Sequence, residues 1–393
     1  MGWRRIRFDR NEVAGAFGDI GTDFPLLAGM ILSAGLDPAS VLAMFGLMQV
    51  ATGLLYGLPM PVQPLKAMAV IVITQKLAPA VLYGGGLAVG LAMLVLAATG
   101  AVEWVARLVP RAVVRGIQFG LGLQLASLAL GRYVAADGPA GYVLAAVAFA
   151  LTVALLGHRR WPPALLVIGL GVGYALIRGA DAWQILSGVS VRLPAPVVPS
   201  ARDIATGFVV LALPQLPLSL ANSVLATRQV VADFFPDHPL TVRRIALTYA
   251  AMNLINPWGG GVPTCHGSGG LAGHYAFGAR TGGSVVIYGA LYLALGVFWS
   301  RGFADVLRLF PLPVLGVILT FEALALMRLL RDLRDPLDLS TALLVSLAVL
   351  GLPYGYVIGL VVGTVLVRLR RPRWEGGEVG SEPGRSAGPE VGI

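Results

Sequence analysis

The strongest constraint on this chain is a series of apolar blocks that recurs from residue 13 to residue 369. Each block is roughly 17 to 25 residues long, which is enough for a helix to cross a hydrocarbon layer about 30 Å thick. Charged residues make up only 12% of the chain, about half their share in a soluble domain. The sequence therefore predicts an all-α integral membrane protein, with the bilayer as its solvent along most of its length.

The blocks divide into about fourteen predicted transmembrane segments. They cover residues 13–34, 38–57, 62–76, 81–99, 111–130, 140–157, 161–178, 203–226, 241–257, 263–277, 283–300, 311–327, 338–350 and 352–369. The third and tenth segments are short and rich in Gly and Pro, so neither should cross as one regular helix. We expect both to be broken helices. They should lie inside the protein or beside a cavity, because irregular backbone at membrane depth is tolerated only there.

Basic residues favour alternate connections between these segments by roughly three to one, as the positive-inside rule requires. Both termini are then cytoplasmic: residues 1–12 form a basic N-terminus, and residues 372–393 form a disordered tail rich in Gly, Glu, Pro and Ser. The expected location is the plasma membrane. The net charge of +9 follows the same bias and forms no basic stripe of the kind that binds nucleic acid. Cys265 is the single cysteine, which excludes an internal disulfide and a multi-cysteine metal site.

The two halves of the chain carry matching irregularities. Residues 13–178 and residues 203–369 each contain seven predicted segments. In each half a Pro-containing first segment is followed, about forty residues later, by a segment broken by Pro and Gly. Because seven is odd, the second half would enter the membrane upside down. This arrangement is an inverted repeat, which is common in secondary transporters.

The two breaks, at residues 61–64 and 263–267, predict an anion site. The second part of a broken helix begins with free N–H groups and with the positive end of its dipole. In inverted repeats these two helix N-termini would face each other near the middle of the membrane. The alternative is that Pro and Gly only kink tightly packed helices, but the matched positions favour the site.

Charged residues near the breaks are further candidates. Lys66 lies inside a predicted span, about one turn into the first half-helix, and could add a full charge to the site or pair with Asp19. Asp19 and Asp23 share a helix face, and a carboxyl group there could take up a proton together with the anion. The alternatives are that Lys66 extends to the interface and that Asp23 caps a helix end.

Polar side chains in both breaks, in the first segment and in the eighth segment are candidates for oxyanion binding. They are Thr22, Gln63, Gln215, Asn222, Thr264, Cys265, His266, Gly267 and Ser268. Ser219 and Ser223 lie near the face of Gln215, where hydrogen bonding between helices is the alternative role. If Cys265 acted as a nucleophile and His266 as its base, the protein would be an enzyme. Adjacent helical residues point about 100° apart, however, and no third group orients this pair.

Several stretches resemble signature blocks of the molybdate transporter family, a group of plant, algal and bacterial proteins related to the sulfate permeases. They are GAFGDIGT at 15–22, PMPVQPLK at 59–66, PQLPLSLANS at 214–223, PTCHGSGGLAG at 263–273 and YAFGAR at 275–280. The similarity covers nearly the whole membrane part. Asp23 departs from it, because an aromatic or aliphatic residue is expected at that position.

The resemblance implies the fold of the sulfate and uracil permeases, with two inverted repeats arranged as core and gate domains. It also implies a site between the third and tenth segments, beside the first and eighth. The residues implied to line that site are Asp19, Thr22, Gln63, Lys66, Gln215, Asn222, Cys265 and His266. The resulting expectation is a secondary transporter, not an enzyme, that imports molybdate together with protons. It would form a homodimer and would need no cofactor and no bound metal.

Other interpretations stay open at this point. Sulfate, tungstate and molybdate are all tetrahedral dianions, so the residues alone also allow a sulfate or general oxyanion transporter. An anion channel on the same fold would pass current without saturation or proton dependence. The chain contains no Gly-x-x-x-x-Gly-Lys-Ser/Thr loop, so a pump driven by its own ATPase domain is not expected.

Overall fold

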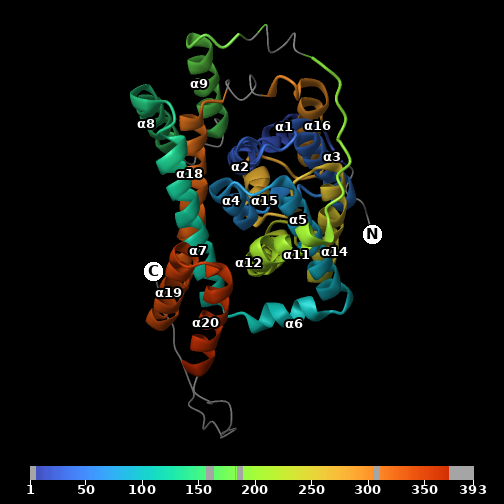
Figure 1. The fold of residues 1–393 in the computed structure, drawn as a ribbon, viewed down its shortest axis with the longest axis vertical. Helices are drawn as coiled ribbons and strands as arrows, with labels where there is room; N and C mark the ends of the chain where they lie inside the picture. The colour runs from blue at the N-terminus through green and yellow to red at the C-terminus, as the bar shows by residue number, and fades with distance from the viewer. Residues whose placement is uncertain (1–5, 156–162, 182, 184–188, 304–309, 371–393) are drawn as a thin grey trace, which may run out of the picture.

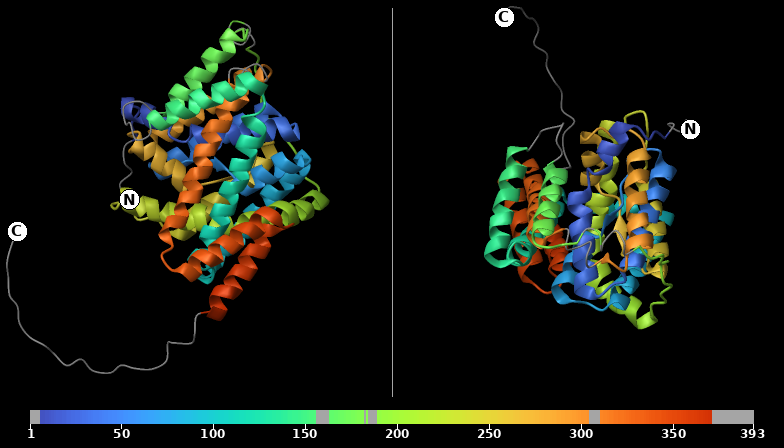
Figure 2. Two further views of the ribbon diagram at one scale, coloured as in Figure 1. Left: turned by 90° about the vertical axis from the view of Figure 1, so that its left-hand side faces the viewer. Right: turned by 90° about the horizontal axis from the view of Figure 1, so that it is seen from above.

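The computed structural model describes residues 6–155, 163–181, 183, 189–303 and 310–370, so the predicted tail at 372–393 lies outside it. Most of the described chain is helical (Figure 1). The helices form two groups, which are also separated in the right-hand view of Figure 2. A short helix, α6 (Ala101–Leu108), runs across one end of the molecule from one group to the other.

The larger group, which we call the core group, draws on both halves of the chain and lies on the right in Figure 1. Its elements from the first half are α1 (Arg10–Ala16), α2 (Ile20–Ala34), α3 (Pro38–Tyr56), β1 (Gln63–Pro64), α4 (Lys66–Gln75) and α5 (Pro79–Ala98). Its elements from the second half are α11 (Ala201–Gly207), η2 (Phe208–Ala212), α12 (Leu213–Leu218), η3 (Ser219–Ala226), α13 (Thr227–Phe234), α14 (Val242–Ile255), η4 (Asn256–Gly259), β2 (Thr264–Cys265), α15 (Ser268–Ala276) and α16 (Gly283–Trp299).

The smaller group, which we call the gate group, lies on the left in Figure 1. Its elements are α7 (Arg111–Leu128), η1 (Ala129–Tyr133), α8 (Gly138–Ala154), α9 (Pro163–Ile177), α18 (Leu312–Arg328), η5 (Leu329–Asp332), α19 (Pro336–Gly351) and α20 (Gly355–Arg370). The two groups meet where α2 contacts α18, where α4 and α12 contact α7, and where α12 contacts α20.

The apolar segments expected from the sequence correspond to these helices. Within the described residues, four helices are long and apolar enough to cross a membrane: Pro38–Tyr56, Pro79–Ala98, Arg111–Tyr133 and Ala201–Phe234. Shorter apolar helices of 10–17 residues account for most of the others. The architecture is that of a multi-pass membrane protein, whereas the total of fourteen crossings and the inverted repeat stay predictions.

The third and tenth segments are broken, as the sequence predicts, but each begins as a short strand. β1 and β2 pair as a two-stranded antiparallel sheet, an element that the all-α expectation does not include. The reason is chemical: proline cannot donate to a helical hydrogen bond, so these Pro-rich stretches stay extended and find partners in each other. The helix after the first strand starts at Lys66, so Lys66 is its first residue and does not lie one turn inside it.

The eighth segment continues beyond its expected end at residue 226 and reaches Phe234. It contains two wide π-helical stretches, η2 and η3, on either side of the short helix α12. Pro214 and Pro217 lie in α12 and remove two backbone donors from this region. Wide turns of this kind are frequent at functional sites, and η3 carries Asn222.

Glu12 anchors the start of the chain to a distant helix. Its side chain is fully buried, and Oε1 accepts the backbone N–H groups of Arg280 at 3.0 Å and Thr281 at 2.9 Å. Oε2 accepts the N–H of Ser284 at 3.0 Å. Because α16 begins at Gly283, this carboxylate satisfies donors that the helix leaves without partners and complements the positive end of its dipole.

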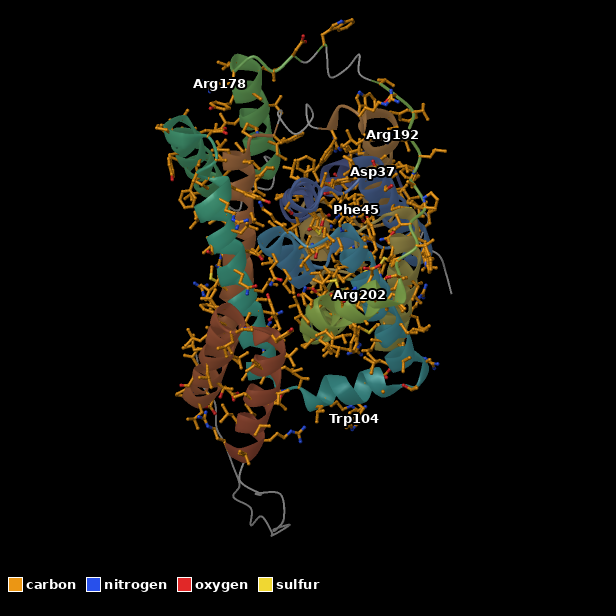
Figure 3. All side chains as sticks on the ribbon, viewed as in Figure 1. Asp37, Phe45, Trp104, Arg178, Arg192 and Arg202 are labelled. Carbon is orange, nitrogen blue, oxygen red and sulfur yellow. The ribbon has the colours of Figure 1, made fainter. Side chains whose placement is uncertain are left out.

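The connecting helix α6 has one buried and one exposed side. Val102 is fully buried, whereas Trp104, which points outward from α6 in Figure 3, is 64% exposed. Tryptophan is enriched where a membrane meets water, because its ring is apolar and its N–H is polar. The exposed Trp104 is therefore consistent with a membrane-interface position for α6, which stays a prediction; in the structure α6 links the core group to the gate group.

Candidate functional site

The two-stranded sheet forms the centre of the core group. Gln63 lies opposite Cys265 and Pro64 lies opposite Thr264, and the Leu65 N–H donates to the Pro263 carbonyl at 3.0 Å. The strands are antiparallel, so α4 starts beside the beginning of β2, and α15 starts beside the beginning of β1. The sheet therefore brings together two half-helices that come from different halves of the sequence.

Two side-chain amides complete the outer edges of this sheet. Gln49 on α3 donates from Nε2 to the Val62 carbonyl at 2.8 Å and accepts the Val62 N–H at 3.0 Å. On the other edge, Asn253 on α14 donates to the Thr264 carbonyl at 2.6 Å and accepts the Thr264 N–H at 2.9 Å. Each amide replaces a missing neighbouring strand, so the extended backbone has partners on both sides at membrane depth.

The N-terminus of α4 is not open to a ligand. Gln215 on α12 accepts the backbone N–H groups of Ala67 and Met68 at 3.0 and 3.3 Å through its Oε1 atom. Its Nε2 donates to Ser219 Oγ at 3.0 Å, and Ser219 in turn lies 2.7 Å from the Tyr249 hydroxyl. Gln215 is thus a cap for the first half-helix, and the symmetric pair of open dipole ends expected from the sequence is reduced to one.

The charged candidates form a hydrogen-bonded series across the break. Lys66 Nζ donates to Gln63 Oε1 at 3.1 Å, and Gln63 Nε2 donates to Asp19 Oδ1 at 2.6 Å. All three side chains are buried, with at most 5% of each exposed. The structure therefore brings together Asp19, Gln63 and Lys66 from α2, β1 and α4, with Gln63 as the link.

The N-terminus of α15 is open. Among the described residues, none accepts a hydrogen bond from the backbone N–H groups of Ser268, Gly269 or Gly270. A Cβ atom added to Gly269 would meet no atom within 4 Å, so there is free space beside this first turn. The side chain of Ser268 donates to Asn222 Oδ1 at 3.1 Å, which places η3 at the same point.

Two glycines let the charged series lie against this helix end. A Cβ atom on Gly267 would overlap the side chain of Gln63, and one on Gly270 would overlap the carboxyl group of Asp19. Both positions therefore require the absence of a side chain. The result is that the Asp19 carboxyl lies directly beside the positive end of α15, where it is stabilised by the helix dipole.

A cavity of about 570 Å³ reaches this region from the space between the two groups. Its lining includes Asn222 and Ser268 from the core group, and Arg115 and Gln118 from the gate group. The open N–H groups of α15 and the Asn222 NH₂ group are suited to donate to the oxygens of a small anion. The single Ser268 hydroxyl hydrogen is donated to Asn222 Oδ1, so Ser268 would donate to an anion in place of that bond.

The other candidates have partners within the protein. His266 is fully buried, with Nδ1 3.2 Å from the Pro61 carbonyl and Nε2 2.8 Å from Thr248 Oγ1. The Thr264 hydroxyl accepts from Asn256, and Cys265 is hydrogen-bonded to Ser223. Thr22 and Asp23 are buried in the first turn of α2. The hydrogen bonds of His266 and Thr264 thus hold the broken segment in place.

Sequence reasoning missed the two residues that brace the sheet, Gln49 and Asn253. Each is a fully buried amide inside an apolar helix. An amide at membrane depth needs a partner, so its position within a predicted span is the signal that could have identified it.

Comparisons with known proteins identify the family of the chain. A family model described as "Molybdate transporter of MFS superfamily" matches residues 11–125 and 207–326. Molybdate transporter 2 of Arabidopsis thaliana is 32% identical, and the match covers 95% of this chain and 90% of that protein. Molybdate transporter 1 of Chlamydomonas reinhardtii is 29% identical, over 91% of each chain.

The fold has solved counterparts. The transmembrane domain of a cyanobacterium bicarbonate transporter, BicA, has a TM-score of 0.65 at 16% identity and covers 92% of this chain and 98% of that one. Murine Solute Carrier 26 family member A9, an anion transporter in the inward-facing state, has a TM-score of 0.67 at 13% identity, covering 93% of this chain and 69% of that one. At such low identity these structures establish the fold alone. The matched family model and the curated relatives go further, and they show that this chain belongs to the molybdate transporter family.

Proposed function

We propose that the protein is a secondary active transporter that carries molybdate through the plasma membrane into the cytoplasm. The observation that carries this proposal is the first turn of α15, where the backbone N–H groups of Ser268, Gly269 and Gly270 have no acceptor among the described residues and Ser268 lines the cavity. A tetrahedral oxyanion needs several donors that converge on it, and a helix N-terminus supplies them together with about half a positive charge.

In this proposal the residues have two kinds of role. Ser268, Gly269 and Asn222 bind the anion directly, and Lys66 adds a full positive charge through its position beside Gln63. Gln215, Thr264, Cys265, His266 and Thr22 instead shape and hold the broken segments. Molybdate is favoured over sulfate by the names of the relatives, because both ions are tetrahedral dianions that suit the same donors.

We further propose that transport occurs by alternating access, with the core group moving against the gate group. The cavity between the two groups is lined by Arg111, Arg115 and Arg228, which the positive-inside rule places on the cytoplasmic side. The structure then corresponds to an inward-facing state with both termini in the cytoplasm. A homodimer remains part of the proposal on the resemblance to the sulfate permeases alone.

The experiment that tests the function is equilibrium binding of molybdate to the purified protein, with sulfate and tungstate as competitors. Saturable binding that a large excess of sulfate fails to displace supports a molybdate transporter. Displacement of molybdate by sulfate at a similar concentration would indicate a general oxyanion transporter. Transport is then measured in proteoliposomes, where current without saturation or proton dependence would indicate a channel instead.

Gly270→Ala is expected to weaken molybdate binding at least tenfold, which corresponds to the loss of about one charge-assisted hydrogen bond. The added methyl group would overlap the Asp19 carboxyl and Pro61, so the first turn of α15 would have to shift and its N–H groups would no longer converge on the anion. The matched control is Gly173→Ala on α9, where a Cβ atom meets nothing within 4 Å. Wild-type affinity in a folded Gly270→Ala protein would remove this helix end from the site.

Asp19 is the proposed site of proton coupling. Its carboxylate lies beside the end of α15 that would hold the substrate, so a negative charge there opposes a dianion and a proton removes the opposition. Asp19→Asn is therefore expected to bind molybdate but to lose the dependence of uptake on the proton gradient. Asp23→Asn should have a smaller effect on that dependence. Equal, mild effects of the two substitutions in proteoliposome uptake assays would contradict the assignment.

A further inference from the structure

Arginine side chains surround the route that leads from the proposed site to the protein surface. The cavity of about 570 Å³ that reaches Ser268 is lined by Arg111, Arg115 and Arg228. A second cavity, of about 290 Å³, is lined by Arg107, Arg111 and Arg368. The two cavities share Arg111 and Val109, so they adjoin at this point of α7.

No acidic residue of the described chain lines either cavity. The larger cavity has apolar walls, which include Val114, Leu220 and Leu225. Walls of low dielectric constant concentrate the field of the charges that they enclose, so an anion in this space is attracted more strongly than one in bulk water. The positive-inside rule accounts for arginines on this side of the membrane, but it does not require them to converge on one cavity.

Asp332, which ends η5, is the acidic residue that engages this cluster. Arg111 donates to Asp332 Oδ2 at 3.0 Å, and Arg115 donates to the same oxygen. Burial raises the pKa of Asp332, but the hydrogen bonds and charges of Arg111 and Arg115 outweigh it and hold that pKa below its usual value. Asp332 is therefore ionised at cytoplasmic pH, and one carboxylate is shared between two guanidinium groups.

Arg115 has hydrogen-bond donors beyond the one that it gives to Asp332. Its side chain is only 17% exposed, and a second nitrogen, Nη1, donates to Gln118 Oε1 at 2.8 Å. The third nitrogen, Nε, is buried, and it has no hydrogen-bond partner among the residues that the structure describes. The planar guanidinium group presents its N–H donors in a fixed geometry that matches a tetrahedral oxyanion. Arg115 and Arg111 could therefore bind such an anion once the Asp332 carboxylate is displaced.

We propose that Arg111 and Arg115 form a second, weaker oxyanion site at the cytoplasmic mouth of the cavity, in which the anion displaces Asp332. This site receives the anion as it leaves the end of α15 and releases it to the cytoplasm. It rests on the proposed function, since it handles the same substrate. The carboxylate of Asp332 limits its affinity, which keeps the site from retaining the anion.

The test is a molybdate titration of the full-length protein in nanodiscs of phosphatidylcholine. We expect two saturable phases, of which Arg115→Gln removes the weaker and leaves the tighter. Asp332→Asn should strengthen the weaker phase about tenfold, because it frees both guanidinium groups of a charged competitor. Arg334→Gln, an exposed charge close by that lines neither cavity, should leave both phases unchanged.

Arg111→Gln gives a second variant should Arg115→Gln fold poorly, because the Arg111 side chain is 66% exposed. A single phase in the wild-type protein, or equal weakening of both phases by either substitution, would overturn the second site while leaving the first intact. The absence of any molybdate binding would overturn the proposed function as well.

The phosphate of a lipid headgroup offers the same chemistry as a soluble oxyanion, so lipid composition is the final variable. If the second site serves the transported anion, both phases persist when phosphatidylglycerol is added to the nanodiscs. If added phosphatidylglycerol abolishes the weaker phase of the wild-type protein, Arg111 and Arg115 bind a lipid headgroup. That result would overturn their proposed role in release of the anion.

Discussion

Replacing Lys66 with methionine is expected to weaken molybdate binding by about two orders of magnitude while the protein remains folded. The ammonium group is the full positive charge nearest to the broken segment, and it is held there by Gln63. A hydrogen bond or contact to a charged group is worth roughly 1.5–3 kcal/mol, and each 1.4 kcal/mol is a tenfold change in affinity. Methionine keeps most of the volume and the apolar stem, so packing around α4 is retained.

The control for this substitution lies just beyond the C-terminal end of α4. Lys76 follows the last residue of α4 and is exposed, so Lys76→Met removes the same charge at the far end. Its molybdate affinity should equal that of the wild-type protein. Binding is measured on purified protein after size-exclusion chromatography, and unchanged affinity in a monodisperse Lys66→Met sample would exclude Lys66 from the site.

Glu12→Ala should prevent accumulation of folded protein. The substitution leaves the backbone N–H groups of Arg280, Thr281 and Ser284 without their acceptor. A buried donor without a partner costs about 1–3 kcal/mol, so three of them cost several kcal/mol, a large part of the stability of most proteins. The measurement is the amount of monodisperse protein after extraction, together with its thermal midpoint.

Glu12→Gln distinguishes the hydrogen bonds from the charge. A glutamine keeps one acceptor oxygen and should therefore recover part of the stability that alanine loses. Asp237→Ala, at an exposed acidic residue between α13 and α14, serves as the control for a general loss of negative charge. A Glu12→Ala protein as stable as the Asp237→Ala protein would show that the cap has no role in the fold.

The sequence was sufficient to predict the breaks but not their partners. Pro and Gly at 61–64 and 263–267 forbid regular helix, and this local effect can be deduced from composition. Which N–H groups remain open depends on Gln215, whose cap on α4 joins residues 148 positions apart. That bond is set by tertiary packing, so a single sequence predicts two equivalent open helix N-termini, whereas in the structure Gln215 caps the N-terminus of α4.

The charged residues also differ in whether local sequence or tertiary packing sets their role. From the sequence, Lys66 could either add charge to the site or pair with Asp19, and Gln63 was a candidate for oxyanion binding. In the structure Gln63 lies between Lys66 and Asp19 and is hydrogen-bonded to both. Arg111 and Arg115, by contrast, belong to the general excess of basic residues that indicates topology, and nothing in the sequence singles them out. Their convergence on one cavity with Asp332 depends on how α7 packs against η5, which no local pattern encodes.

The sheet between β1 and β2 also constrains how the chain can be assembled. The strand partner of Gln63 is Cys265, so the ribosome must add about 200 further residues, over roughly 10–40 s, before the pair can form. Throughout that interval the first break presents bare backbone polar groups, which lipid cannot solvate. Until the second half is made, the polar backbone groups of the first break must therefore be hydrogen-bonded by the insertion machinery or by water within it. Assembly of the sheet thus requires about two thirds of the chain, so the first half cannot complete its structure before the second half is made.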